Sequence, residues 1–400
     1  MHAHPIIQDL LCKHCPQVHA KRRNCLAKVV DACIHSGLTL LKMSQALASH
    51  SALKHRIKCC DRLLSNPHLY NEKETIYSAM AGAVLNNVCL TGIVIDWSDL
   101  LRDGSAHLLR AAVIVKGRAF TLYEQVFSNQ DYAKPAVYRQ FLLTLRQILP
   151  EACRPVLITD AGFRASWFKL ANELQFEWVG RIRNRDMVRI ESSDTWNGCK
   201  TWYPEAKGSP RSLGQFEYAR SNPIACRLVI YKKPHKNRHN KTAFGKNARN
   251  HSSLKSRAAQ IEPWLLACSP SLASVSATRI VDLYAGRMQI EQTFRDVKNP
   301  QWGMGLSDSQ TTRLGRLAIL LLIGALASYA LWLIGLAAQH TGFEVTYGSK
   351  KKAANTLSII SLARFWISEK NTLAIAVSAR WRFAHAYRTG LSYMRGRVRT

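Results

Sequence analysis

The chain has 400 residues, 47% of them hydrophobic, so it has room for two or three domains and enough apolar side chains to exclude wholesale disorder. Its 56 Lys and Arg residues against 26 Asp and Glu residues give a net charge of +30. This basic balance favours nucleic acid as the partner, with a ribosome-associated protein or a membrane protein with basic loops as the alternatives. The 11 scattered cysteines and the lack of a signal-peptide pattern favour a reducing cytoplasm.

Residues 1–85 are predicted to be helical because apolar side chains recur at helical spacing. Thr39 and Ser51 stand where each could cap a short helix, and the second of these helices is rich in Lys and Arg. Two short helices with a tight junction predict a helix-turn-helix-like DNA-binding domain. An ordinary helical bundle with a solvated basic face is the alternative.

Between residues 89 and 183 the pattern changes to that of strands. Two apolar runs, Cys89–Asp96 and Arg154–Asp160, each end in an aspartate. The carboxyl ends of strands are the usual place for a site in an open α/β sheet. The other elements predicted here are a hairpin of 107–116 and 118–126, helices over 134–149 and 165–174, and a strand over 176–182.

Residues 184–277 interrupt this rhythm and predict an insertion with strands over 228–231 and 264–268. The stretch 232–257 between these strands is basic and has no acidic residue. It is either a solvated loop or a loop that orders on phosphate. A helix predicted over 277–297 follows the insertion.

The segment Leu317–Ala338 has 22 residues and no charge. It is long enough to span a bilayer, but a helix buried on all sides of a soluble domain has the same composition. Further helices are predicted over 352–368 and 371–386.

Three carboxylates are candidates for chemistry on a phosphodiester. Cleavage needs an activated water and a stabilised leaving oxygen, and two divalent metals about 4 Å apart can serve both needs. Magnesium prefers carboxylate oxygens, and Asp96 and Asp160 are each predicted to end a buried strand. The alternative for each aspartate is a turn or helix cap.

The helix predicted over 277–297 presents the third carboxylate among cations. Positions three or four apart share one helical face, which here carries Tyr284, Arg287, Glu291, Arg295 and Lys298. A surface salt-bridge ladder is the alternative. A fixed acid among bases is typical of a site in which the acid holds metal and the bases grip phosphate.

The spacing Tyr284-x2-Arg287-x3-Glu291-x6-Lys298 resembles the signature of the insertion-sequence-four transposases, a family with the DDE catalytic triad. The resemblance covers nearly the whole chain, is greatest to the transposon-ten type, and includes the segments Val94–Asp99 and Asp160–Phe163. Asp99 rivals Asp96, but the family pattern places the metal ligand at the earlier aspartate.

The resemblance implies an α/β fold with an RNase H-like mixed sheet core, a β-rich insertion, and helical N-terminal and C-terminal regions. The domains would be a DNA-binding domain over 1–85, the first part of the core over 86–183, the insertion over 184–277, the catalytic helix and a buried helix over 278–340, and a C-terminal region over 341–400 that could serve dimerisation. It also favours burial of Leu317–Ala338 over a membrane span, because family members place a long core helix after the catalytic helix.

The resemblance further implies a cut-and-paste DNA transposase that moves an insertion sequence through a DNA hairpin intermediate. Asp96, Asp160 and Glu291 would bind two Mg²⁺, for which Mn²⁺ could substitute. The partners would be double-stranded DNA, as inverted-repeat ends and as target, and a second copy in a synaptic homodimer. The location would be the bacterial cytoplasm, at the nucleoid, with no membrane.

The resemblance assigns the remaining candidate residues to DNA. Tyr284, Arg287 and Lys298 would hold phosphates, and Arg295 would also contact DNA. The other candidates are Trp264, which would stack on an unstacked base, and Arg181 and Arg183, which would touch the hairpin. Trp264 could instead pack in the insertion sheet. Trp97 follows Asp96 but faces the opposite side of its strand, so it is interpreted as core.

A non-enzymatic DNA-binding regulator is the alternative from another class, and it leaves the carboxylate set unexplained. An inactivated copy of a transposase is a further alternative.

Overall fold

The computed structural model describes residues 3–85, 90–115, 118–183, 186–234, 246–251, 253–254, 261–340, 342–343 and 357–369. The chain forms two compact units, one of Met1–Pro155 with Met288–Thr400 and the other of Val156–Arg287. Each unit contains helices and β-strands, so the predicted mixed α/β class is confirmed.

The N-terminal part of the first unit is helical. Thr39 caps its third helix as predicted, since its side chain accepts a hydrogen bond from the amide of Lys42 at 3.3 Å. The prediction for Ser51 is wrong, because Ala52 occupies the N-cap position of the next helix and no side chain caps it. The helices of this part are α1 (His4–His14), α2 (Ala20–Ser36), α3 (Leu40–Ala46), α4 (Leu53–Leu64) and α5 (Pro67–Leu85).

Three antiparallel strands follow, β1 (Leu90–Asp99), β2 (Ala106–Val115) and β3 (Arg118–Ser128). The sequence predicted that β1 ends at Asp96, and that prediction is wrong. The next three residues of β1 continue the ladder against β2 as far as Asp99. Asp96 therefore projects from within a paired strand. The predicted helix over 134–149 is α6 (Pro135–Ile148), which packs against α5 and β3.

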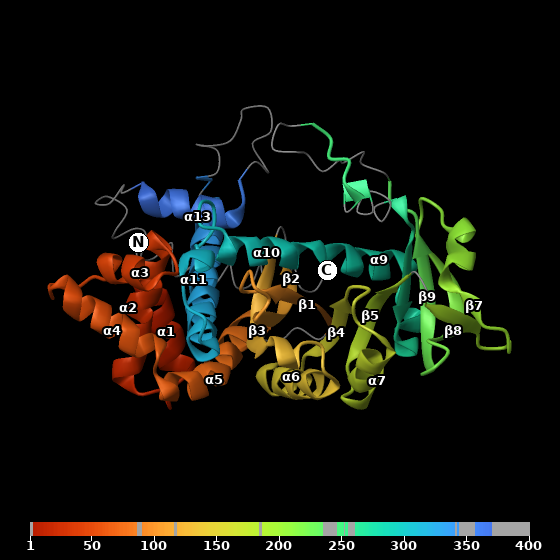
Figure 1. Ribbon diagram of the computed structural model, residues 1–400, viewed down its shortest axis with the longest axis horizontal. Coiled ribbons are helices and arrows are strands. Elements are labelled where there is room, and N and C mark those ends of the chain that lie inside the picture. The colour runs from red at the N-terminus through yellow and green to blue at the C-terminus, as the bar shows by residue number, and fades with distance from the viewer. Residues whose placement is uncertain are drawn as a thin grey trace. The chain divides into compact units, whose positions relative to one another are not determined.

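The long apolar helix α11 (Leu314–His340) lies at the centre of the first unit. It contacts α2, α5, β3 and the short helix α13 (Ile359–Ser368) (Figure 1). By length and composition α11 could cross a membrane, but 94% of its most apolar stretch is buried in the protein. The prediction of a buried core helix is confirmed, and the helix predicted over 371–386 lies outside the described residues.

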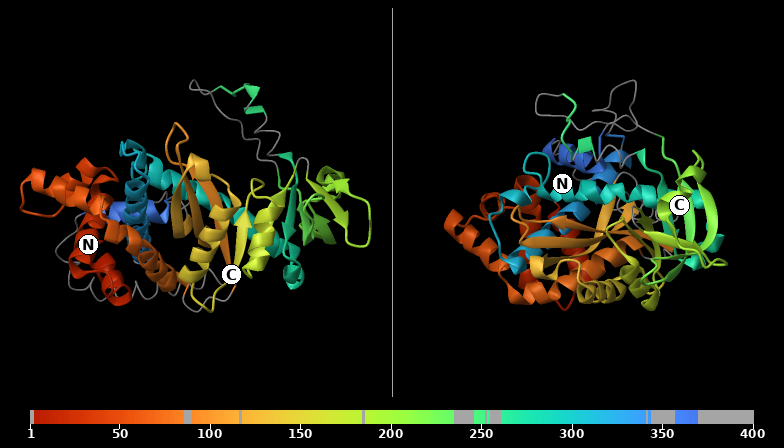
Figure 2. Two further views of the ribbon diagram at one scale, coloured as in Figure 1. Left: turned by 60° about the horizontal axis from the view of Figure 1, so that its bottom comes forward. Right: turned by 45° about the vertical axis from the view of Figure 1, so that its right-hand side comes forward.

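The second unit is organised around a sheet with the strand order β4-β5-β10-β9-β8-β6-β7, whose yellow and green strands are seen in Figures 1 and 2. β4 and β5 are parallel, and the other neighbours are antiparallel. Because β10 pairs with both β5 and β9, the strands after residue 184 extend this sheet. The strands are β4 (Arg154–Thr159), β5 (Glu177–Ile182), β6 (Met187–Ile190), β7 (Asn197–Gly198), β8 (Arg211–Tyr218), β9 (Ile224–Tyr231) and β10 (Trp264–Cys268).

The single helix predicted over 277–297 is two helices, α9 (Ala277–Gly286) and α10 (Met288–Lys298). They are interrupted at Arg287, whose amide bonds to the carbonyl of Tyr284, three residues back, at 3.1 Å. α9 packs against the sheet of the second unit, as does α7 (Ala165–Glu173). Short 3₁₀ helices cover Asn129–Asp131, Cys199–Glu205, Pro270–Ser274 and Leu306–Asp308.

Candidate active site

The first unit brings two of the three predicted carboxylates to one cavity. Asp96 and Glu291 both line a hollow of about 570 Å³, although 195 positions separate them in the chain. Glu291 belongs to the first turn of α10, where the positive end of the helix dipole favours a carboxylate. Arg295 and Lys298 follow at helical spacing and line the same cavity. The predicted common face is therefore confirmed for these three residues of α10.

Asp96 is half-buried on β1, and its Oδ1 accepts a hydrogen bond from the amide of Trp97 at 2.9 Å. The indole of Trp97 packs against Phe127 and Tyr132 and donates to the hydroxyl of Tyr138 at 3.1 Å. The indole is packed, as the core interpretation expects, but Trp97 is half-buried and also lines the cavity of Asp96. The rigid partner strand and the packed indole together hold Asp96 in place.

Lys298 ties α10 to β1 at the edge of the cavity. Its ammonium donates to the hydroxyl of Ser98 at 2.6 Å and to the carbonyl of Asp99. Burial, and then the nearby charge of Arg110, lowers the pKa of Lys298 to about 8. The predicted phosphate-binding lysine is thus a cation whose charge is sensitive to pH near neutrality.

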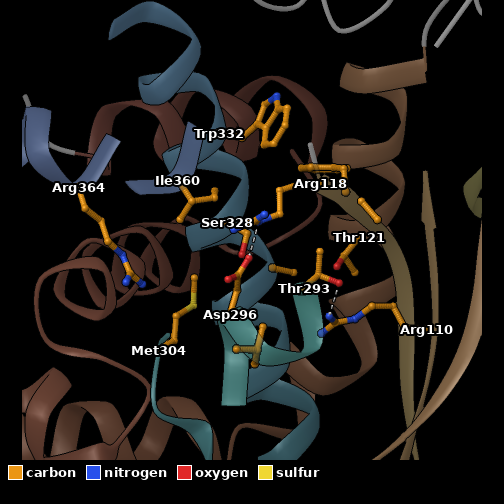
Figure 3. A pocket seen from close by; sticks show the side chains of 14 residues that line it. Arg110, Arg118, Thr121, Thr293, Asp296, Met304, Ser328, Trp332, Ile360 and Arg364 are labelled. Carbon is orange, nitrogen blue, oxygen red and sulfur yellow. Dashed lines mark hydrogen bonds and ion pairs between the residues drawn. The ribbon is translucent and has the colours of Figure 1, made fainter. Parts of the chain in front are cut away.

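A buried ion pair beneath the cavity supports α10. Arg110 lies opposite Asp96 in the strand register and donates to Glu124 at 2.7 Å, and both side chains are almost fully buried. The hydroxyl of Tyr77 donates to the same carboxylate at 3.1 Å. Arg110 also donates to Thr293 of α10 at 3.3 Å, as Figure 3 shows.

A second contact fixes the outer side of α10. Arg118 of β3 pairs with Asp296 at 2.9 Å (Figure 3). It also donates to Gln292 at 2.6 Å. Both arginines line a small cavity of about 30 Å³ between β3, α10 and α11. Arg110 is held by its buried pair with Glu124 and contacts α10 through Thr293, whereas Arg118 contacts α10 through a partly exposed ion pair. Both arginines therefore link α10 to the neighbouring strands.

The supporting residues were missed by the sequence reasoning. The available signal was a charged residue inside each of two apolar strands, Arg110 in β2 and Glu124 in β3. A buried charge is stable only when it is paired, so two such residues on neighbouring strands indicate a pair.

The second unit carries the third carboxylate. Asp160 directly follows β4, and its Oδ1 accepts a hydrogen bond from the amide of Gly162 at 2.8 Å. A Cβ at position 162 would lie 3.0 Å from that oxygen, so glycine leaves room for the tight turn. Asp160 therefore shapes its own turn.

Tyr284 and Arg287 neighbour Asp160 within the second unit. Burial raises the pKa of Tyr284, whereas the charges of Arg287 and Arg181 and a hydrogen bond from Arg287 lower it, and Asp160 raises it. The Tyr284 phenol is therefore within electrostatic reach of two arginines and of Asp160.

The other predicted DNA contacts of the second unit have protein partners. Trp264 is half-buried, with its ring 4.9 Å from that of Tyr284, and the ammonium of Lys233 lies 4.8 Å from its centre. The carboxylate of Glu262 forms ion pairs with Arg183 at 2.6 Å and with Arg181 at 3.5 Å.

Two of the three predicted acids thus share a cavity, and the third belongs to the other unit. Among the described residues, no group of three or more His, Cys, Asp or Glu side chains could hold a metal ion. Asp96 and Glu291 supply hard oxygen ligands of the kind that Mg²⁺ prefers. They are two carboxylates, whereas the predicted metal site needs three.

A cavity that combines two carboxylates with an arginine and a lysine has the charges needed to bind a cation and a phosphate group. The family model described as "Transposase DDE domain" matches residues 89–328, which is more than half of the chain. The protein belongs to this family of DDE transposases, whose activity is DNA transposition.

One solved structure that resembles the chain is the cryo-EM structure of the piggyBac transposase synaptic complex with hairpin DNA. The identity is 11%, the TM-score is 0.35, and the match covers 98% of this chain and 77% of that chain. No curated protein matches the sequence.

Proposed function

We propose that the protein is the cut-and-paste transposase of an insertion sequence, of the insertion-sequence-four family and closest to the transposon-ten type. The observation that carries the proposal is the cavity shared by Asp96 and Glu291, with Arg295 and Lys298 at its edge. All four residues lie in the stretch that the transposase family model matches. The class expected from the carboxylate spacing and the class expected from family membership therefore coincide.

Asp96, Glu291 and, from the second unit, Asp160 would hold two Mg²⁺ ions, for which Mn²⁺ could substitute. Their oxygen ligands fit a hard divalent cation. When bound, the ions would activate the attacking hydroxyl and stabilise the leaving oxygen. In this proposal β1–β3, β4, β5 and α10 form an RNase H-like core, and the predicted five-part domain division applies.

The cations would position the DNA strand. Lys298 and Arg295 would hold phosphates at the cavity, and Tyr284, Arg287 and Arg183 would hold them in the second unit. A phosphate would have to compete with Glu262 for Arg183, because that ion pair already exists.

Hairpin formation needs an unstacked terminal base, and Trp264 would offset part of that cost by stacking. The lysine already above its ring would then share the indole with the base. In the cell, the protein would act as a homodimer on inverted-repeat ends and target DNA, in the bacterial cytoplasm.

The decisive experiment incubates the purified protein and its own element's end DNA with Mg²⁺, and separates the products on a denaturing gel. The wild type should give nicks and hairpins, and Asp160→Ala should bind the ends in a gel shift but cut nothing. Asp96→Asn should also be inactive.

Asp99→Asn is the matched control, because Asp99 is three residues away on the same strand and its side chain pairs with His107 at 2.9 Å. It should cut normally. Wild-type protein that binds but never cuts would support the regulator or an inactivated copy, and equal loss in Asp96→Asn and Asp99→Asn would contradict the assignment of the ligand.

A further inference from the structure

Trp302 is the most exposed large apolar side chain among the described residues. Its exposed fraction is 74%, whereas the next is 52% at Leu41. Tryptophan is usually well buried, and an indole in water forgoes the stabilisation of burial. A single exposed apolar residue is nevertheless common, so exposure alone does not define a site.

The backbone around Trp302 is held firmly. Asn299 Oδ1 accepts hydrogen bonds from the amides of Gln301 and Trp302, each at 2.8 Å. Arg364 of α13 donates to the carbonyls of Trp302 at 3.0 Å and of Gly303 at 3.3 Å. These four hydrogen bonds fix the backbone of the loop, although the indole of Trp302 is exposed to solvent.

Gly303 makes this turn sterically specific. A Cβ at position 303 would lie 2.5–2.8 Å from three carbonyl oxygens at the end of α10, those of Arg295, Asp296 and Asn299. Contacts this close are not tolerated, so the loop is folded directly onto the end of the helix that carries Glu291.

The loop continues the wall of the candidate active site. Asn299 and Pro300 line the cavity that holds Asp96 and Glu291. Asn299 thus belongs to the cavity wall and also positions the amide of Trp302. The exposed ring therefore lies on a short, braced extension of the cavity rim.

The charge beside the ring indicates what could cover it. Arg295 is exposed and Lys298 lies at the same rim, in a chain with a net charge of +30. A partner that combines an anionic backbone with flat apolar faces is a nucleic acid strand whose bases are accessible. Aromatic side chains stack on such bases regardless of sequence.

We propose that Trp302 is a stacking platform for an unpaired nucleobase of the DNA strand that enters the Asp96–Glu291 cavity. The proposal rests on the proposed function and adds a base contact on the first unit to the one assigned to Trp264. Its ligand is a base next to the reacting phosphate.

The test couples a protein change to a base change in end DNA. Abasic sites are placed one at a time within three nucleotides of the cleavage point, and binding and nicking are measured for wild type, Trp302→Ala and Trp302→Phe. Trp302→Ala should weaken binding or nicking about 5- to 150-fold, and Trp302→Phe should retain most of the activity. At one position the abasic site should remove the difference between wild type and Trp302→Ala.

A 2-aminopurine at that position should be quenched by wild type and remain bright with Trp302→Ala. Phe365→Ala removes another exposed aromatic ring of the first unit, 40% exposed, and should leave both readouts unchanged. Because the Trp302 side chain is exposed, the Trp302→Ala variant should have the circular dichroism spectrum of the wild type.

Two outcomes would overturn the inference while the proposed function stands. In one, the wild type nicks the DNA and Trp302→Ala matches it with every abasic substrate. In the other, Trp302→Ala loses self-association by light scattering but keeps the 2-aminopurine quench, which would assign the ring to a protein interface. A wild type without any nicking would instead contradict the proposed function.

Discussion

Lys298 shows how one residue links the cavity to its surroundings. Its ammonium bonds to β1 through Ser98 and Asp99, and its position on α10 places it near Glu291. Arg110 of β2 contacts the same helix through its hydrogen bond to Thr293. The chemistry of the cavity therefore depends on buried residues that do not line it, as well as on the acids themselves.

DNA binding should weaken as the pH rises through about 8, the pKa of Lys298. A lysine whose pKa is lowered loses its charge above that pH, and a neighbouring phosphate favours the charged form, so binding there takes up a proton. Affinity for end DNA, measured by fluorescence anisotropy at constant salt from pH 6.5 to 9.5, should fall in the wild type.

Lys298→Arg is the matched variant, because an arginine stays charged over this range. Its affinity should remain flat with pH. An equal fall in both proteins would show that another group titrates.

At the scale of elements, α11 and α13 form a close helix pair at the centre of the first unit. Gly335 of α11 faces Ile359, the first residue of α13, and a Cβ at position 335 would lie under 3.0 Å from its carbonyl oxygen. α13 in turn supplies Arg364, which braces the Trp302 loop. Gly335 thus allows α13 to pack closely on α11, and this packing positions Arg364 against the Trp302 loop.

Gly335→Ala should destabilise the protein by about 1–3 kcal/mol, because the added methyl group forces α13 away from α11. Gly82→Ala in α5 is the matched control, since a Cβ there meets nothing within 4 Å. That variant should stabilise the protein by about 0.5–1 kcal/mol, through helix propensity alone. The measurement is the urea midpoint of each purified variant, and shifts of the same sign would contradict the packing argument.

At the scale of the whole molecule, the net charge of +30 is the dominant property. Part of this charge is already paired inside the protein, as with Arg110, Arg118 and Arg183. Arg295 and other exposed cations remain available to a polyanion. Binding to duplex DNA should therefore be largely electrostatic and release counterions.

The affinity for a random duplex should fall steeply with KCl. If 6–10 phosphates are neutralised, the loss between 50 and 200 mM salt is about 10³- to 10⁵-fold. Arg295→Gln should reduce the slope of log affinity against log salt by about 0.9 if this side chain contacts one phosphate. A salt-independent affinity would contradict the electrostatic interpretation.

Much of the local structure followed from the sequence. α6, β4, β5 and β10 lie within one or two residues of their predicted bounds, because strong apolar periodicity is a local property. β8 was missed because it is polar, half-exposed and interrupted by a register shift between Ser212 and Gly214, so its pairing depends on β9 and not on its own pattern.

By itself the sequence determined the mixed α/β class, the candidate carboxylates and the resemblance to a transposase, since these depend on residue type and spacing. The tertiary structure decided that α11 is buried, that Asp96 and Glu291 share a cavity, and that Trp302 is exposed on the loop that follows the cavity residues Asn299 and Pro300. It also revealed the Arg110–Glu124 pair. The physical reason is that burial and charge pairing are set by segments far apart in the chain, whose contacts no local pattern encodes.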